Sequence, residues 1–162
     1  MTSLDPADFF HTGVAVPDLT AAMQGFSDAL NITWTAVQSF RLDVRMGNTD
    51  ARLSSRFVYS TSGPPFLELV EAIPDTPWAA PGAPQLHHLG YWADDLAAAV
   101  ADLERDGGVV EAFDVGTHSD MNIFAFVRCM GVRVELINGA RRQALLEMIQ
   151  GTGDPHREGA RA

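Results

Sequence analysis

The sequence predicts an α+β protein built from two tandem βαβββ modules, and three observations support this prediction. A segment near the N-terminus recurs later in the chain, so that His11 and Gly13 correspond to His88 and Gly90. Each copy is an apolar strand-like run that leads into a helical pattern, and three more strand-like runs follow it. A proline-rich segment separates the two copies. Duplication on this scale indicates a repeated structural unit.

The first module is expected at residues 9–73. Its opening run, Phe9–Val16, is rich in β-branched and aromatic residues and predicts a strand. Asp18 predicts a helix N-cap, and the apolar residues from there to Leu30 recur at spacings of three and four. Three further strands are predicted at 32–40, 51–60 and 66–70, with turn signals at Gly47-Asn48 and at 62–65.

The second module is expected at residues 86–138, after a linker at 74–85 that holds four of the nine prolines. Its strands are predicted at 86–93, 109–115, 121–129 and 132–138, and its helix at 94–106. Residues 139–150 predict a C-terminal amphipathic helix, and residues 151–162 are expected to form a disordered tail.

Composition excludes several classes of function. The formal net charge is −10, and all eleven positive side chains are arginines, so lysine chemistry is absent. Nucleic acids and anionic membranes need a basic footprint, which this chain lacks. No apolar run approaches the roughly 20 residues of a membrane-spanning helix, and a single cysteine excludes an intrachain disulfide. We expect the protein to be cytoplasmic and to form a homodimer.

Strand periodicity separates the histidines. Alternate side chains of a strand face opposite sides of the sheet. His11 therefore lies on the face opposite to the residues that pack on the following helix. The repeat gives His88 the same position, and its neighbour His87 is expected to point towards the helix layer.

Each module also has a glutamate in the middle of its last strand, Glu68 in the first and Glu135 in the second. A carboxylate among apolar neighbours is unfavourable unless it finds a partner or a wet face. Facing modules would bring two imidazoles and two carboxylates together. The sequence thus predicts a divalent-metal site formed by His11, Glu68, His88 and Glu135. The predicted modules form a curved mixed sheet around this metal-centred cleft. Zinc, nickel, cobalt, manganese and iron all suit these donors.

The motifs are His-x-Gly-x-Ala-Val-x-Asp-Leu at 11–19, Leu-Glu-Leu at 67–69, His-His-Leu-Gly at 87–90 and Gly-Val-Arg-Val-Glu-Leu-Ile at 131–137. Together they resemble the vicinal oxygen chelate superfamily, which includes glyoxalases, bleomycin-resistance proteins and dioxygenases built from paired βαβββ modules. The resemblance covers residues 9–138. It places the family's four metal positions on His11, Glu68, His88 and Glu135, and is nearest to the glyoxalase I and methylmalonyl-CoA epimerase branch.

For that branch the resemblance implies a lyase or isomerase that removes a proton next to a carbonyl or thioester of a small substrate. We choose Glu135 as the catalytic base and Glu68 as the second candidate. This order is a choice, because no feature of the sequence distinguishes the two glutamates. The alternatives are a non-catalytic protein that binds a drug or natural product, and an iron-dependent dioxygenase. No arginine cluster marks a coenzyme A or glutathione site.

Four residues are candidates for substrate binding. Arg133 shares a strand face with Glu135 and could hold a carboxylate or phosphate, although pairing with a glutamate is an equal alternative. Trp34, Phe66 and Trp92 could form an apolar wall, or they could serve packing alone. A loop histidine, His118, is expected to be exposed.

Overall fold

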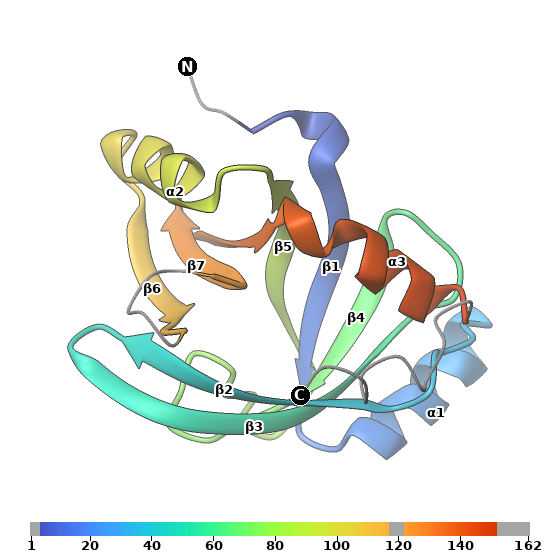
Figure 1. Ribbon diagram of the computed structural model, residues 1–162. Helices are drawn as coiled ribbons and strands as arrows, with labels where there is room; N and C mark the ends of the chain where they lie inside the picture. The colour runs from blue at the N-terminus through green and yellow to red at the C-terminus, as the bar shows by residue number, and fades with distance from the viewer. Residues whose placement is uncertain (1–3, 117–121, 152–162) are drawn as a thin grey trace, which may run out of the picture.

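The computed structural model describes residues 4–116 and 122–151, and its elements follow the order strand, helix, three strands twice (Figure 1). The first half comprises β1 (Phe9–Val16), α1 (Leu19–Leu30), β2 (Gln38–Met46), β3 (Thr49–Tyr59) and β4 (Phe66–Glu71). The second comprises β5 (Gln85–Ala93), α2 (Leu96–Arg105), β6 (Val109–Asp114), β7 (Phe124–Cys129) and β8 (Val132–Asn138). Short 3-10 helices, η1 (Pro6–Asp8) and η2 (Gly139–Arg141), precede β1 and follow β8, and α3 (Arg142–Ile149) follows η2. The predicted α+β fold is confirmed.

The eight strands close into one barrel in the order β1-β4-β3-β2-β6-β7-β8-β5. β1 and β5, the opening strands of the two halves, pair antiparallel, and each pairs in parallel with the last strand of its own half. The four strands β4, β1, β5 and β8 therefore lie side by side. They are the strands on which the sequence placed its histidines and glutamates.

Helix starts follow the local signals. The side chain of Asp18 accepts a hydrogen bond from the Ala21 amide at 2.9 Å, and Asp95 does the same for Ala98 at 2.9 Å. Each carboxylate satisfies an amide that the first helical turn leaves unpaired.

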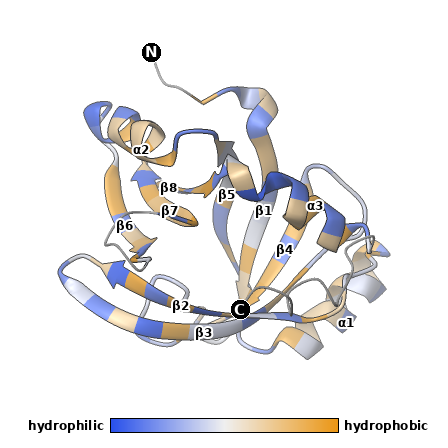
Figure 2. Ribbon diagram, viewed as in Figure 1, coloured by the Kyte–Doolittle hydropathy of each residue, from blue (hydrophilic) through white to orange (hydrophobic). Residues whose placement is uncertain are grey.

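α1 and α2 lie outside the sheet at opposite ends of the molecule, while α3 crosses in front of β1 and β4 (Figure 1). Figure 2 shows α3 alternating between hydrophilic and hydrophobic residues, as expected of a helix with one packed face. No helix in 4–116 or 122–151 is long and apolar enough to span a membrane.

The proline-rich segment contributes to the core as well as connecting the halves. Trp78 and Ala80 are buried there, and the Trp78 ring lies 5.0 Å from that of Phe126 and 5.9 Å from that of Phe124. These aromatic residues fill the barrel together with Ala15 of β1. A buried tryptophan removes a large apolar area from water, so this segment helps to hold the two halves together.

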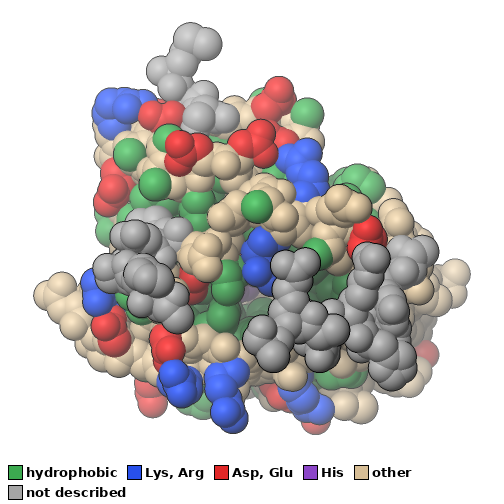
Figure 3. Space-filling model, in the orientation of Figure 1, with side chains coloured by type: hydrophobic (Ala, Val, Ile, Leu, Met, Phe, Trp, Pro, Cys, Tyr) green, Lys and Arg blue, Asp and Glu red, His purple; other side chains and the backbone are tan. Residues whose placement is uncertain are grey.

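The second strand differs from its prediction. It begins at Gln38 and runs to Met46, instead of occupying 32–40. The charged residues along it pair across the hairpin with β3: Asp43 with Arg52, and Arg45 with Asp50, each at 2.7 Å. Red and blue side chains lie beside one another over this hairpin at the lower edge of Figure 3. Alternating charges on a wet strand face are compatible with a sheet when cross-strand partners neutralise them. The predicted tail beyond residue 151 and His118 lie outside the described residues.

Candidate metal centre

His11, Glu68, His88 and Glu135 meet inside the barrel, and their donor atoms all lie within 4.8 Å of one another. Nε2 of His11 lies 3.5 Å from Oε2 of Glu68 and 3.1 Å from Oε2 of Glu135. Nε2 of His88 lies 3.2 Å from each of the same two oxygens. Both imidazoles are buried, and the carboxylates are only 12% and 15% exposed. The cluster joins four residues that the sequence alone placed on separate strands.

Two glycines make room for this arrangement. In the β1–β5 ladder His11 lies opposite Gly90, and Gly13 lies opposite His88. A Cβ on Gly90 would overlap the His11 ring, and a Cβ on Gly13 would overlap the His88 ring. Each histidine therefore lies over the glycine of the other half. This close approach is the physical reason for the repeated His-x-Gly pattern.

The donor set fits a divalent ion. Bonds of about 2.1 Å would place neighbouring ligands about 3.0 Å apart in octahedral and about 3.4 Å apart in tetrahedral coordination. The distances from imidazole to carboxylate, 3.1 to 3.5 Å, fall in this range. The two Nε2 atoms lie 2.7 Å apart and would have to separate slightly. Two neutral nitrogens and two anionic oxygens suit an ion of borderline hardness. The buried cluster could hold one such ion.

Electrostatics within the cluster favour a cation. Burial lowers the pKa of His88, but Glu135 and Glu68 outweigh burial and raise it to about 9. The pKa of His11 is also raised, because Glu135 and Glu68 act against its burial. Burial raises the pKa of Glu135, yet His88 and His11 bring it down to about 2, and the pKa of Glu68 falls well below its ordinary value for the same reason. The carboxylates thus create a negative potential that either protons or a metal ion can satisfy.

A chain of hydrogen bonds fixes the tautomer of His88. The carbonyl of Pro77 can only accept, so Nε2 of His87, 2.6 Å away, must donate to it. In a neutral His87 ring, Nδ1 is then an acceptor, and Nδ1 of His88, 2.8 Å away, must donate to it. Burial, with His88 and Arg133, lowers the pKa of His87 to about 4, which keeps that ring neutral. A neutral His88 consequently presents the lone pair of Nε2 to the cluster, as a metal ligand must.

The position of His87 corrects the expectation from strand parity. Its ring stacks beside Trp78 at 6.2 Å and lies 5.3 Å from Phe126, both core residues, so it does not point towards a helix. The β1–β5 register shifts between Gly13 and Val14, and such an irregularity re-aims a side chain. A simple period of two cannot detect it.

Tyr59 is a site residue that the sequence reasoning missed. It lies opposite Glu68 in the β3–β4 ladder, and its ring makes an edge contact with that of His11 at 5.4 Å. Burial, reinforced by Glu68 and Glu135, raises the pKa of its hydroxyl well above the ordinary value, so it stays protonated. Pairing β3 with β4 would have identified Tyr59 as a site residue, because Tyr59 and Phe57 then share the interior face of the barrel.

A cavity of about 190 Å³ opens over the cluster, and Glu68, His88 and Glu135 line it directly. Apolar and aromatic side chains form most of the wall, and Arg141 of η2 is also part of it. The remaining lining residues are Phe40, Leu42, Phe57, Tyr59, Val70, Trp78, Ile123, Phe124, Ile137 and Leu145. The arrangement offers a polar reaction centre at one side of a small apolar chamber.

None of the four residues predicted to bind substrate lines this cavity. Phe66 and Trp92 are buried in a cluster under α3, and neither lines the cavity. Trp34 packs on α1, where its indole NH donates to the Met23 carbonyl at 3.1 Å. Arg133 pairs with Glu111 at 2.5 Å and lines another hollow, whose wall includes His87 and His88. Arg133 thus has the glutamate partner that was given as an alternative, and the role of these four residues in substrate binding stays a prediction.

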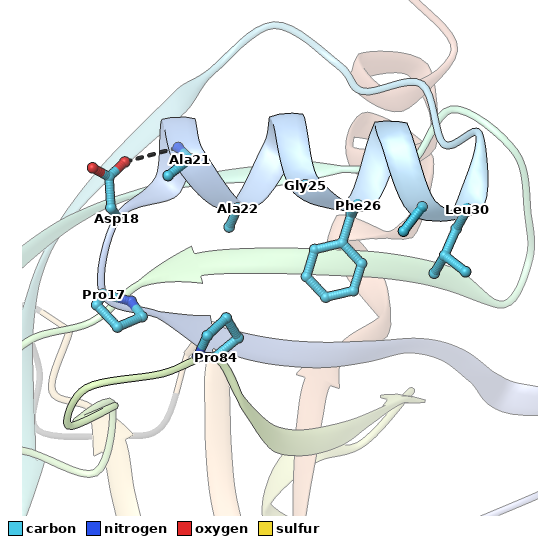
Figure 4. Close-up of a pocket in the computed structure, with 9 residues that line it drawn as sticks. Pro17, Asp18, Ala21, Ala22, Gly25, Phe26, Leu30 and Pro84 are labelled. Atoms are coloured by element: carbon cyan, nitrogen blue, oxygen red, sulfur yellow. Dashed lines mark hydrogen bonds between the residues drawn. The ribbon is translucent and has the colours of Figure 1, made fainter.

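An apolar hollow of about 560 Å³ lies along α1 and shares no residue with the cavity over the cluster. Figure 4 shows its lining, with Ala22, Gly25, Phe26 and Leu30 on the helix and Pro84 across from them. Its one ionisable group, Asp18, already caps the helix. Apart from this capping carboxylate, the described lining residues of the hollow offer no group that could move a proton or hold a metal ion.

Comparison with known proteins agrees with this architecture. Residues 10–126 match the model of the glyoxalase/bleomycin resistance protein/dioxygenase superfamily. No curated protein gives a significant match. A solved structure of Streptomyces coelicolor methylmalonyl-CoA epimerase in complex with 2-nitronate-propionyl-CoA is similar at 19% identity, with a TM-score of 0.55 and coverage of 85% of this chain and 99% of that one.

Two further structures share the fold. Methylmalonyl-CoA epimerase from Mycobacterium tuberculosis is 18% identical, with a TM-score of 0.52 and coverage of 90% of this chain and 96% of that one. A variant of 4-hydroxymandelate synthase from Streptomyces coelicolor is 20% identical, with a TM-score of 0.52 and coverage of 83% and 38%. At these identities the similarity shows the fold alone. With the family match, the paired modules and the His/Glu cluster together, this chain belongs to the glyoxalase/bleomycin resistance protein/dioxygenase superfamily.

Proposed function

We propose that this protein is a metal-dependent lyase or isomerase that removes a proton next to a carbonyl or thioester of a small substrate. The observation that supports this most strongly is the placement of Glu68, His88 and Glu135 on the wall of a small apolar cavity. A divalent ion held by these residues and His11 would polarise the oxygen of a bound carbonyl and so acidify the neighbouring carbon.

Glu135 is the proposed base. Burial raises the pKa of Glu135, but His88 and His11 outweigh it and lower the pKa to about 2, so the carboxylate is unprotonated at neutral pH, as a base must be. The C–H bond breaks, its proton passes to Glu135, and its electron pair forms an enolate with the carbonyl. Return of a proton to the opposite face gives isomerisation, and loss of a leaving group from the neighbouring carbon gives elimination. Glu68 is the alternative base. The protonated hydroxyl of Tyr59 is placed to donate a hydrogen bond to the Glu68 carboxylate.

The first test is metal content. Protein purified without added metal should contain one divalent ion per chain, and a chelator should remove it together with any activity. A chain that holds no stoichiometric metal, and whose stability is unchanged by chelator, would remove the basis of the proposal. The same experiment identifies the metal, which the donor set leaves open among zinc, nickel, cobalt, manganese and iron.

The second test is solvent exchange. The metal-loaded protein should catalyse incorporation of deuterium from D₂O next to the carbonyl of small ketones, keto acids or acyl thioesters. The thioesters tested include methylmalonyl-CoA, which is bound in a solved structure of a similar epimerase. Glu135→Gln should abolish exchange, whereas Glu104→Gln, which alters an exposed helix residue, should leave it intact. Oxygen consumption without exchange would favour a dioxygenase. Tight binding of an aromatic natural product without either reaction would favour the binding role.

A further inference from the structure

Among the described residues, the cavity over the cluster has one positively charged side chain in its lining, that of Arg141. The other described lining groups are apolar or aromatic side chains, members of the His/Glu cluster, or the cluster's neighbour Tyr59. Arg141 is exposed, whereas the cluster is buried, so it lies at the solvent side of the chamber. A ligand that spans the cavity would contact the cluster at one end and Arg141 at the other.

Arg141 is also unusual among the arginines. In the part of the chain that the structure describes, seven arginines contact a carboxylate: Arg45, Arg52, Arg56, Arg105, Arg128, Arg133 and Arg142. Arg41 and Arg141 do not. The contrast with the next residue is clear, because Arg142 pairs with Asp8 at 2.6 Å and lies 5.4 Å over the Trp92 ring. Two consecutive arginines therefore have different surroundings, and only one of them faces the cavity.

The backbone that carries Arg141 is held in place. η2 follows β8 directly, and the side chain of Asn138 accepts a hydrogen bond from the Ala140 amide at 3.0 Å. The amide nitrogen of the same Asn138 side chain donates to the Asn122 carbonyl at 2.9 Å. Arg141 is thus anchored through a short turn to the strand that carries Glu135. A positive group on a fixed backbone can define one end of a binding site.

The charges balance in favour of an anion. A divalent ion, two carboxylates and two neutral imidazoles sum to zero, so the loaded cluster adds no net charge to the chamber. Arg141 then leaves the chamber with a charge of about +1. The whole chain has a net charge of −10, which disfavours anions elsewhere on its surface. An anionic ligand therefore has a specific partner in this cavity, and a guanidinium fits a carboxylate with two parallel hydrogen bonds.

We propose that the substrate is a small carboxylate with an apolar body, whose carboxylate binds Arg141 and whose carbonyl end lies at the His/Glu cluster. This inference rests on the proposed function and names its substrate class. The cavity, at about 190 Å³, is below the roughly 300–1,000 Å³ of sites for drug-sized ligands. A coenzyme A ester carries several phosphates, and the described residues offer no group of unpaired cations to receive them. Arg141 is accordingly a specificity-determining residue.

The test compares acids with their uncharged analogues. The probes are 5-oxohexanoate and 4-oxo-4-phenylbutanoate, each beside its primary amide, titrated calorimetrically into the zinc-loaded protein. At least one acid should bind the wild type about tenfold more tightly than its amide, the low end for a charged hydrogen bond because Arg141 is exposed. Arg141→Gln should remove this preference. Arg41→Gln makes the same charge change at another arginine without an acid partner, one outside the cavity, and should retain it.

Two results would overturn the inference: the wild type shows no preference for acids over amides, or the preference persists in Arg141→Gln. Zinc affinity, measured by chelator competition, should be equal in both variants, so a lost preference cannot arise from a lost metal. The proposed function is judged separately by deuterium exchange. Deuterium exchange into amides and acids alike would reject the carboxylate substrate class but support the proposed reaction. Acid-selective binding without exchange would support the substrate class but reject the proposed reaction.

Discussion

Gly13 and Gly90 are the residues on which the shape of the candidate metal centre depends most directly. Each lies under an imidazole of the other half of the barrel, where a Cβ would overlap the ring. Both rings are buried, so neither can move aside without disturbing packed neighbours. The close approach of strand backbone and imidazole sets where Nε2 of each histidine lies.

Gly90→Ala is therefore expected to displace His11 and to weaken zinc binding by about tenfold or more, in line with the effect of changes just outside a metal's ligands. The measurement is zinc affinity by competition with a chromogenic chelator. Gly25→Ala is the matched control, because a Cβ there meets nothing within 4 Å. Its affinity should be unchanged and its stability raised by up to about 1 kcal/mol, since alanine favours a helix. Equal zinc affinity in the two variants would contradict this account.

His87 supports His88 through its ring nitrogens. Phenylalanine at this position keeps an aromatic ring beside Trp78 but removes the acceptor for His88 Nδ1. We expect His87→Phe to lower zinc affinity by about 10- to 100-fold, because the ligand loses the partner that fixes its tautomer. His87→Gln keeps an acceptor and should recover part of the loss. Identical affinities for the two variants would mean that His87 serves packing only.

At the scale of elements, Glu111 ties three strands together. It lies on β6 and accepts from Arg128 of β7 at 2.6 Å and from Arg133 of β8 at 2.5 Å. Arg133 also donates to the Pro77 carbonyl at 3.1 Å, which joins the proline-rich segment to the same network. Burial raises the pKa of Glu111, but Arg133 and Arg128 outweigh burial and lower it.

Glu111→Gln should reduce the free energy of unfolding by about 1–2 kcal/mol at pH 7, since one arginine loses its acceptor and the other keeps only a neutral one at a partly exposed site. The pKa of Glu111 is lower folded than unfolded, so its stabilisation is present above its unfolded value near 4.5 and is lost as pH falls through the folded value. Urea denaturation of variant and wild type should accordingly converge in acid. Glu104→Gln, an exposed change, should match the wild type throughout. A difference that stayed constant down to pH 3 would refute the ionic origin.

At the scale of the whole molecule, the candidate metal centre takes one residue from each of four strands. β1 and β4 belong to the first half, and β5 and β8 to the second. One chain supplies all four donors, so the expected homodimer, which stays a prediction, is not needed to complete the site. An ion in the cluster would link both halves of the barrel, and its binding energy would add to the stability of the folded state.

Metal removal should therefore destabilise the entire fold. With free zinc at about a hundred times its dissociation constant, linkage gives about 2.7 kcal/mol of stabilisation, or about 5–10 °C in Tm for a chain of this size. Scanning calorimetry with zinc and with chelator measures the shift. His11→Asn should show a much smaller shift, because it replaces a buried ligand. An equal shift in this variant would place the stabilising ion elsewhere.

The repeated pattern allowed much of the fold and the meeting of the four clustered residues to be predicted. Strand parity around His11 and Glu68 is a local property with a period of two, and duplication gave it a second, independent reading at His88 and Glu135. Helix starts at Asp18 and Asp95 were legible because capping depends on a few neighbouring residues. The boundaries of β2 were not, because its ion pairs are formed with another strand.

The sequence by itself determined the two βαβββ units and the four candidate ligands, because alternation and capping are written in neighbouring residues. Only the tertiary structure decided that His87 turns inward, that Trp78 fills the core, and that Tyr59 and Arg141 join the cavity. The physical reason is barrel closure. It brings together residues far apart in the chain, and a register shift of one residue reverses the facing of a side chain, which no local pattern records.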